Sequence, residues 1–176
     1  MKKIVLAMLC AGVCVFGMTG CGDEEKAGSK NGYSSPEKAF EAYSSAMVEW
    51  DAEKMLTLVP EEYIKLISEK NGYDINELEV EMQRVIESKW TCGKGSGEIV
   101  LEEVEYKDKK YVNYASDSME WNEERLGMEI EYEDFCLTHC EVIGEEYWQI
   151  TGDDSYIEFY KHDGKWYSAS ALDYIL

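Results

Sequence analysis

SSPEKAFEAY (residues 34–43) is the stretch that decides how the fold begins. Its serines can cap a helix, Pro36 suits the first helical turn, and Glu37 lies near the positive helix end, which favours an acidic side chain. Apolar side chains then recur at spacings of three, four and three residues: Phe40, Tyr43, Met47 and Trp50. The pattern predicts a helix with one buried face.

Three more helices are predicted after this one. Asp51 can cap a short second helix, and Pro60 restarts the chain as a third helix that stops at Asn71-Gly72. Asp74, with Glu77 three residues on, is expected to cap the longest helix. The buried stripe of that helix should consist of Ile75, Leu78, Met82, Val85, Ile86 and Trp90.

The hydrophobic period changes after residues 91–97 (TCGKGSG) from that of a helix to that of strands. A short helix is expected at residues 117–127. Helices followed by a run of antiparallel strands indicate an α+β fold. The expected strands cover residues 99–106, 111–114, 128–132, 135–143, 147–151, 156–160 and 165–171, and the last two form a hairpin.

Three stretches carry a resemblance to a known group. Residues 35–43 (SPEKAFEAY) and 51–56 (DAEKML) resemble the first helices of bacterial lipoproteins with a nuclear transport factor 2-like (cystatin-like) domain, a largely uncharacterised group. Residues 161–167 (KHDGKWY) are similar to its closing hairpin. The resemblance covers most of residues 34–172. It implies N-terminal helices packed on the concave face of a curved, cone-like antiparallel sheet, and it implies the fold more than any activity.

Residues 1–20 are predicted to be a lipoprotein signal peptide. Two lysines precede an apolar run that is too short and wrongly flanked for a transmembrane helix. The segment Met18-Thr19-Gly20-Cys21 resembles a lipobox, in which the cysteine becomes the lipid-modified first residue of the mature chain. The alternative is an ordinary secreted protein with a chance cysteine. We expect a protein held by Cys21 on the extracytoplasmic face of a bacterial cell membrane.

The rest of the chain is predicted to divide into a tether and one domain. Residues 21–33 contain the lipidated cysteine and a polar, glycine-containing stretch without apolar periodicity, which is typical of a flexible linker. Residues 34–176 are expected to form a single domain, because the 156 residues left after removal of the signal peptide suffice for one hydrophobic core.

The acidic charge limits the partners of this protein. The whole chain carries a net charge of −20, with 37 acidic and 17 basic residues. Such a surface argues against nucleic acid and against electrostatic docking on anionic lipid, so attachment must be covalent, through Cys21. The acidic residues are dispersed, which favours a solvated surface over a cation site. No cofactor or metal site is predicted, since zinc, calcium, phosphate-loop and dinucleotide motifs are lacking.

Three cysteines remain beyond the signal peptide and Cys21: Cys92, Cys136 and Cys140. Cys136 and Cys140 would lie on one face of a strand about 13 Å apart, too far to pair with each other. A disulfide of Cys92 with Cys136 or Cys140 is therefore the only plausible bridge, and an extracytoplasmic location would permit it.

Two histidines are the candidates for acid–base chemistry. His162 falls in a predicted tight turn, where a solvated role is favoured. His139 is the remaining candidate for catalysis, and strand alternation should place it on the face opposite Cys136 and Cys140. No carboxylate is specified as its partner, so no catalytic residue is assigned.

The C-terminal half is rich in aromatic residues, which are the remaining candidates for a functional surface. Two interpretations are open: they fill the interface between sheet and helices, or they line a pocket or a partner surface. The candidates for such a surface are Tyr147, Trp148, Tyr156, Tyr160 and Trp166.

The leading functional hypothesis is a membrane-anchored lipoprotein whose domain binds a protein or a small apolar ligand without catalysis. The alternative is a small enzyme of the same fold that uses His139 or a carboxylate in its cavity. A third hypothesis is a structural envelope protein that acts as a homodimer formed through its sheet. A deep pocket with a buried histidine or aspartate at its floor would favour the enzyme, whereas a filled apolar interior would count against it.

Overall fold

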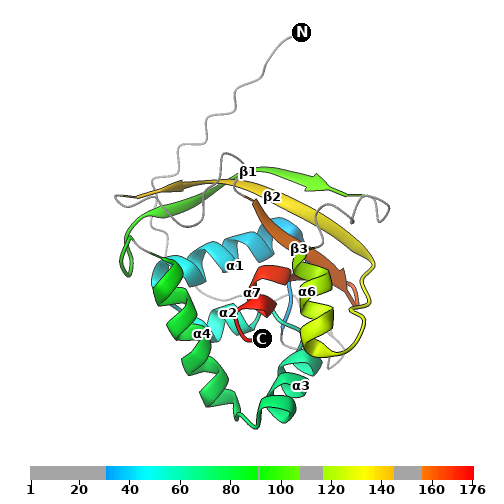
Figure 1. Cartoon of the computed structure of the whole chain (residues 1–176). Coiled ribbons are helices and arrows are strands. Elements are labelled where there is room, and N and C mark those ends of the chain that lie inside the picture. Colours follow the sequence, from blue (N-terminus) through cyan, green and yellow to red (C-terminus); the bar gives the residue numbers. More distant parts are fainter. Residues whose placement is uncertain (1–30, 91, 108–116, 145–155) are drawn as a thin grey trace, which may run out of the picture.

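The computed structural model describes residues 31–90, 92–107, 117–144 and 156–176 (Figure 1). Several sequence predictions lie outside these residues. They are the signal peptide (1–20), Cys21 and the tether as far as residue 30, the strands expected at 111–114 and 147–151, and the aromatic residues Tyr147 and Trp148.

Four helices open the described chain: α1 (Pro36–Glu49), α2 (Ala52–Leu56), α3 (Glu61–Asn71) and α4 (Ile75–Lys89). The capping residues act as the sequence predicts. The Asp51 carboxylate accepts a hydrogen bond from the backbone N–H of Lys54 at 2.8 Å. Asp74 and Glu77 form a reciprocal capping box at the start of α4. These caps satisfy backbone donors that a helix leaves unpaired in its first turn.

The described strands form one antiparallel sheet in the order β1-β2-β3-β4. Its members are β1 (Glu98–Tyr106), β2 (Asp134–Ile143), β3 (Tyr156–His162) and β4 (Lys165–Ser168). Helix α6 (Asp117–Leu126) precedes β2, and helix α7 (Ala169–Asp173) follows β4. The predicted α+β class is confirmed, with helices and an open four-stranded antiparallel sheet.

One predicted strand is shorter than expected, and another is not formed. The strand expected at residues 165–171 ends at Ser168, because the Ser168 hydroxyl accepts from the N–H of Ala171 and starts α7. Residues 128–132 form an irregular connection instead of a strand. Side chains satisfy the backbone there: the N–H of Ile130 donates to Glu123 at 2.9 Å, and the carbonyl of Glu131 accepts from a histidine ring. The segment therefore needs no neighbouring strand.

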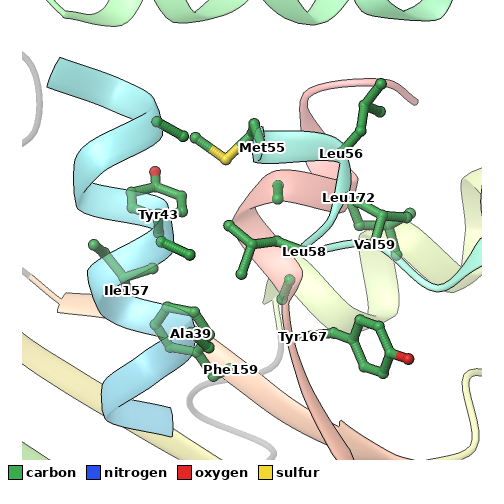
Figure 2. Close-up of a cluster of buried hydrophobic side chains, with 14 of the residues drawn as sticks. Ala39, Tyr43, Met55, Leu56, Leu58, Val59, Ile157, Phe159, Tyr167 and Leu172 are labelled. Atoms are coloured by element: carbon green, nitrogen blue, oxygen red, sulfur yellow. The ribbon is translucent and has the colours of Figure 1, made fainter. Parts of the chain in front are cut away.

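The helices lie on one side of the sheet, and α1 runs beneath it in contact with all four strands (Figure 1). The core lies between these layers. Figure 2 shows Tyr43 of α1 beside Phe159 of β3, with Met55 of α2 and Leu172 of α7 nearby. All four side chains are buried. Burial of such side chains from both layers is what fixes α1 to the sheet.

Packing begins three residues before the predicted start of the domain at residue 34. We call residues 31–33 the strap. Tyr33 forms an antiparallel bridge with Trp166 of β4, with backbone N–O distances of 3.0 and 2.8 Å. The Asn31 amide donates to the carbonyl of Val59 at 2.8 Å. The polar composition of the strap does not predict that it packs on the domain, because backbone and amide hydrogen bonds hold it there and no apolar pattern is involved.

No helix within the described ranges is long and apolar enough to span a membrane.

Candidate functional site

His139 lies in β2 on the exposed side of the sheet, away from the buried Cys136 and Cys140. Its Nε2 atom is 3.2 Å from a carboxylate oxygen of Glu105 in β1. Hydrogen bonds from Lys107 and His139 lower the pKa of Glu105, against a small opposing effect of burial. The histidine favoured as a catalytic candidate thus forms a surface contact between strands and does not lie at the floor of a cavity.

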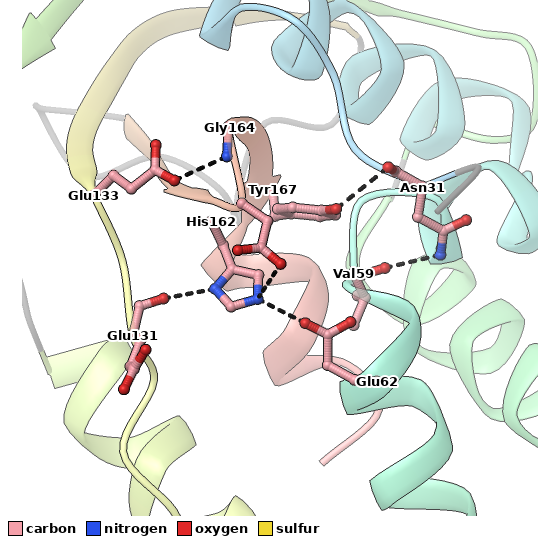
Figure 3. Close-up of polar contacts among 9 residues, drawn as sticks. Asn31, Val59, Glu62, Glu131, Glu133, His162, Gly164 and Tyr167 are labelled. Carbon is pink, nitrogen blue, oxygen red and sulfur yellow. Dashed lines mark hydrogen bonds and ion pairs between the residues drawn. The ribbon is translucent and has the colours of Figure 1, made fainter. Parts of the chain in front are cut away.

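His162 corrects the prediction of a solvated turn residue. It is the last residue of β3, and only 16% of its side chain is exposed. Its Nδ1 atom is 2.8 Å from the carbonyl oxygen of Glu131, and its Nε2 atom is 2.6 Å from a carboxylate oxygen of Glu62 (Figure 3). Because a carbonyl can only accept, Nδ1 carries a proton and Nε2 faces the carboxylate.

A two-residue turn fixes the position of His162. Asp163 and Gly164 both have positive φ angles, 48° and 76°, and His162 pairs with Lys165 across the turn. Positive φ at both central residues is typical of a type I′ turn, which matches the twist of the flanking strands. The Gly164 N–H also donates to Glu133 at 2.9 Å, which ties the turn to the irregular connection before β2.

The charges around His162 are predominantly negative. Burial lowers the pKa of His162, but the hydrogen bonds to Glu131 and Glu62 and the charges of Glu62 and Asp163 outweigh burial, so that the pKa is raised overall. The ring of Tyr63 lies 5.6 Å from the imidazole, centroid to centroid. Burial raises the pKa of Tyr63 to about 12, and the charges of nearby carboxylates act in the same direction: Glu62, Glu131, Asp163 and Glu123.

The structure brings three possible metal ligands together at this point. One oxygen of Glu62, Nε2 of His162 and one oxygen of Asp163 all lie within 4.8 Å of one another. The sequence alone does not reveal this group, because Glu62 and His162 are separated by 100 residues. The His-Asp-Gly turn was visible in the sequence, but nothing in the pattern indicated that α3 would lie against it.

The described aromatic candidates do not form one surface. Tyr160 and Trp166 are buried in the core, so the interpretation as sheet–helix packing is correct for these two, and a partner surface that includes them is wrong. Tyr156 is exposed. The hydroxyl of Tyr160 has no hydrogen-bond partner among the described residues, and burial raises the pKa of this group well above its ordinary value.

The cysteines Cys92, Cys136 and Cys140 are free thiols in the structure, so the predicted disulfide is not formed. The position of Cys92 explains this. A Cβ atom added to Gly144 would overlap the sulfur of Cys92, which places Cys92 just past the end of β2. Cys140 lies four residues before Gly144, a separation of about 13 Å along an extended chain, beyond the reach of a disulfide.

An open groove of about 290 Å³ lies where α4 begins. It is lined by Tyr73, Asp74, Asn76, Glu77, Val80 and Glu81. Tyr73 and Val80 are exposed, with 60% of Val80 accessible to solvent. The neighbouring Ile75 was predicted to be buried but is exposed, because the first turn of α4 extends past the core. The connection of α3 to α4 lies at the end of the molecule opposite the sheet (Figure 1).

No family model, curated protein or solved structure matches this chain.

Proposed function

We propose that the protein is a lipid-anchored, extracytoplasmic binding protein that holds a basic segment of a partner protein in the groove at the start of α4. The observation that carries the binding role is the groove itself: exposed apolar side chains surrounded by carboxylates. The anchoring role rests on the sequence Met18-Thr19-Gly20-Cys21 after an apolar run.

The groove favours a protein segment over a small apolar ligand. Ligand pockets for small molecules are typically about 300–1,000 Å³ and enclose most of the ligand. This groove is at the lower limit of that range and is open, so it suits one or two side chains of a longer chain. Tyr73 and Val80 would contact an apolar side chain of the partner.

Charge complementarity defines the partner as basic. Asp74, Glu77 and Glu81 line the groove. Only Glu81 has a cationic partner among the described contacts of these three, Arg84 at 2.9 Å. A partner with lysine or arginine on either side of an apolar residue would complement this arrangement, and the charge of the whole protein would speed their association.

The domain is proposed to have the nuclear transport factor 2-like fold. Helices on one side of an open antiparallel sheet, with α1 beneath all four strands, support that assignment. The enzyme alternative is weakened, because His139 lies on the exposed side of the sheet and apolar side chains pack between sheet and helices.

Binding is tested by titrating the protein with a synthetic peptide that carries lysines around one leucine, and with the same peptide carrying glutamates. We expect only the lysine peptide to bind, and to lose affinity as salt is added. Val80→Ser should weaken binding about tenfold, since burying a valine contributes about 1.5 kcal/mol. Ile143→Ser is the matched control, because Ile143 is also exposed, with 48% accessible to solvent, but it is the last residue of β2 and does not line the groove. Equal affinity for both peptides would contradict the proposal.

Anchoring is tested separately with Cys21→Ser. We expect the unaltered protein to fractionate with bacterial membranes and the variant to be released into the soluble fraction. A variant that stays in the membrane fraction would contradict lipid attachment at Cys21, and it would leave the groove proposal to its own test.

A further inference from the structure

We propose that Glu62, His162 and Asp163 form a binding site for a divalent transition metal ion, and that Zn²⁺ suits the site. The three side chains come from two separate parts of the fold: the first turn of α3 and the β3–β4 hairpin. The site is distinct from the groove at α4 and does not depend on the proposed partner.

The histidine is already oriented as a metal ligand. In metal sites, a ligating histidine usually donates its second ring N–H to a carbonyl or a carboxylate, which fixes the ring and its tautomer. His162 makes this bond through Nδ1 to the carbonyl of Glu131 at 2.8 Å. The remaining nitrogen, Nε2, points at Glu62, as Figure 3 shows. His139 has no such bond to a backbone carbonyl among its described contacts.

The carboxylates lie close to the distances that an ion requires. Nitrogen and oxygen ligands bind Zn²⁺ at about 2.0–2.2 Å, so ligand atoms around a tetrahedral ion are about 3.3 Å apart. Nε2 of His162 is 2.6 Å from Glu62 and 4.0 Å from Asp163. Each carboxylate must therefore shift by less than about 1 Å relative to the imidazole. Glu62 is 54% exposed and Asp163 is 91% exposed, so both have room to move.

The ligand set selects the class of ion. Calcium and magnesium prefer sites made of oxygen ligands alone, whereas an imidazole nitrogen suits zinc and its neighbours among the transition metals. Two carboxylates would neutralise the charge of a divalent ion, and Glu131 and Glu123 add negative charge around the neighbouring Tyr63. Three protein ligands leave one position of a tetrahedral ion for water.

The test is calorimetric titration of the full-length protein with Zn²⁺ alone and, separately, with Mg²⁺, at neutral pH. We expect one zinc site that Mg²⁺ does not fill. Asp163→Asn should weaken zinc binding at least about tenfold, as loss of one ligand does. Asparagine tolerates the positive φ of residue 163, so this variant should fold normally. His139→Asn is the matched control and should bind zinc as the unaltered protein does.

A second measurement locates the ion on the ring. In nitrogen NMR spectra of the histidine side chains, Zn²⁺ should shift the Nε2 signal of His162 and leave both ring signals of His139 unchanged. Zinc should also raise the melting temperature of the unaltered protein and of His139→Asn, and raise that of Asp163→Asn by less at the same zinc concentration. Equal zinc affinity in Asp163→Asn and the unaltered protein, or no shift at His162, would overturn the proposal, and the contact would then serve only to join α3 to the hairpin.

Discussion

Gly32 is a residue at which the fold leaves no room for a side chain. Its φ angle is 84°, and an added Cβ would lie 2.6 Å from the ring of Tyr167. Neither constraint shows in the sequence, where Gly32 belongs to a polar stretch that predicts a flexible linker. A left-handed backbone and a ring against the α-carbon both require glycine.

Gly32→Ala should therefore destabilise the protein by about 1–3 kcal/mol, measured by urea unfolding. The control is Gly72→Ala, because Gly72 also has a positive φ, 70°, but an added Cβ would meet nothing within 4 Å. Its cost should be limited to the backbone conformation, about 1 kcal/mol. Equal losses in the two variants would show that the strap does not pack against Tyr167.

The three described cysteines should differ in reactivity. Burial, with smaller contributions from Asp134 and Glu37, raises the pKa of Cys136 from 9.0 to about 12, and burial raises that of Cys140 to about 11. Alkylation requires the thiolate, and a pKa raised by three units lowers the thiolate fraction about a thousandfold near pH 8. Cys92 is partly exposed.

Mass-spectrometric mapping after iodoacetamide treatment near pH 8 should therefore find Cys92 modified first, and Cys136 and Cys140 modified only after unfolding. Treatment in denaturant is the control, since all three should then react alike. A Cys92 that resists alkylation in the native protein and reacts only after reduction would point to a disulfide after all.

At the scale of elements, local sequence signals predicted the helices well and the strands in part. Asp51 and Asp74 each cap a backbone N–H three residues further along the chain, so the local sequence is enough to predict where these helices begin. Residues 128–132 alternate as a strand would, but no strand is formed, because their backbone groups pair with the side chains of Glu123 and His162 instead of a neighbouring strand. The outcome depended on tertiary contacts that periodicity does not encode.

The start of helix α7 can be tested in the same way, because the strand predicted at residues 165–171 ends there at Ser168. Ser168 is buried, and its hydroxyl accepts from the N–H of Ala171 at 3.1 Å. Ser168→Ala should cost about 1–2 kcal/mol of unfolding free energy, because the cap is lost and a buried donor is left unpaired. Ser170→Ala, two residues further along the same helix, should change stability by less than about 0.5 kcal/mol. A neutral Ser168→Ala would mean that packing alone starts the helix.

At the scale of the whole molecule, charge is the property most directly given by the composition. The chain has 37 acidic and 17 basic residues, and folding brings these like charges closer together than they are in the unfolded chain. Repulsion among them therefore destabilises the folded state. The candidate metal site could not be foreseen in this way, because it depends on α3 lying against a hairpin 100 residues away. Composition predicts the sign of the surface, but only the fold brings particular carboxylates to one histidine.

Stability should therefore rise with ionic strength. Raising sodium chloride from about 0.01 M to about 0.15 M shortens the screening length from about 30 Å to about 8 Å, which weakens the repulsion among surface carboxylates. The melting temperature, measured by circular dichroism, should increase, and potassium chloride should act equally, because screening is not specific to the cation. A decrease with salt would show that ion pairs outweigh the repulsion.

If the chain is anchored at Cys21 as proposed, the strap would have a mechanical consequence. A force between the membrane and a bound partner would reach the domain at the strap. There, Asn31 is hydrogen-bonded to Val59, just after α2, and Tyr33 forms its bridge with β4. The hydrogen bonds of Asn31 and Gly32 to residues 56–59, and then the two backbone hydrogen bonds between Tyr33 and Trp166, would bear the load before α1 did. Under tension the strap would detach first. Its residues would then lengthen the linker to the membrane while the rest of the domain stays folded.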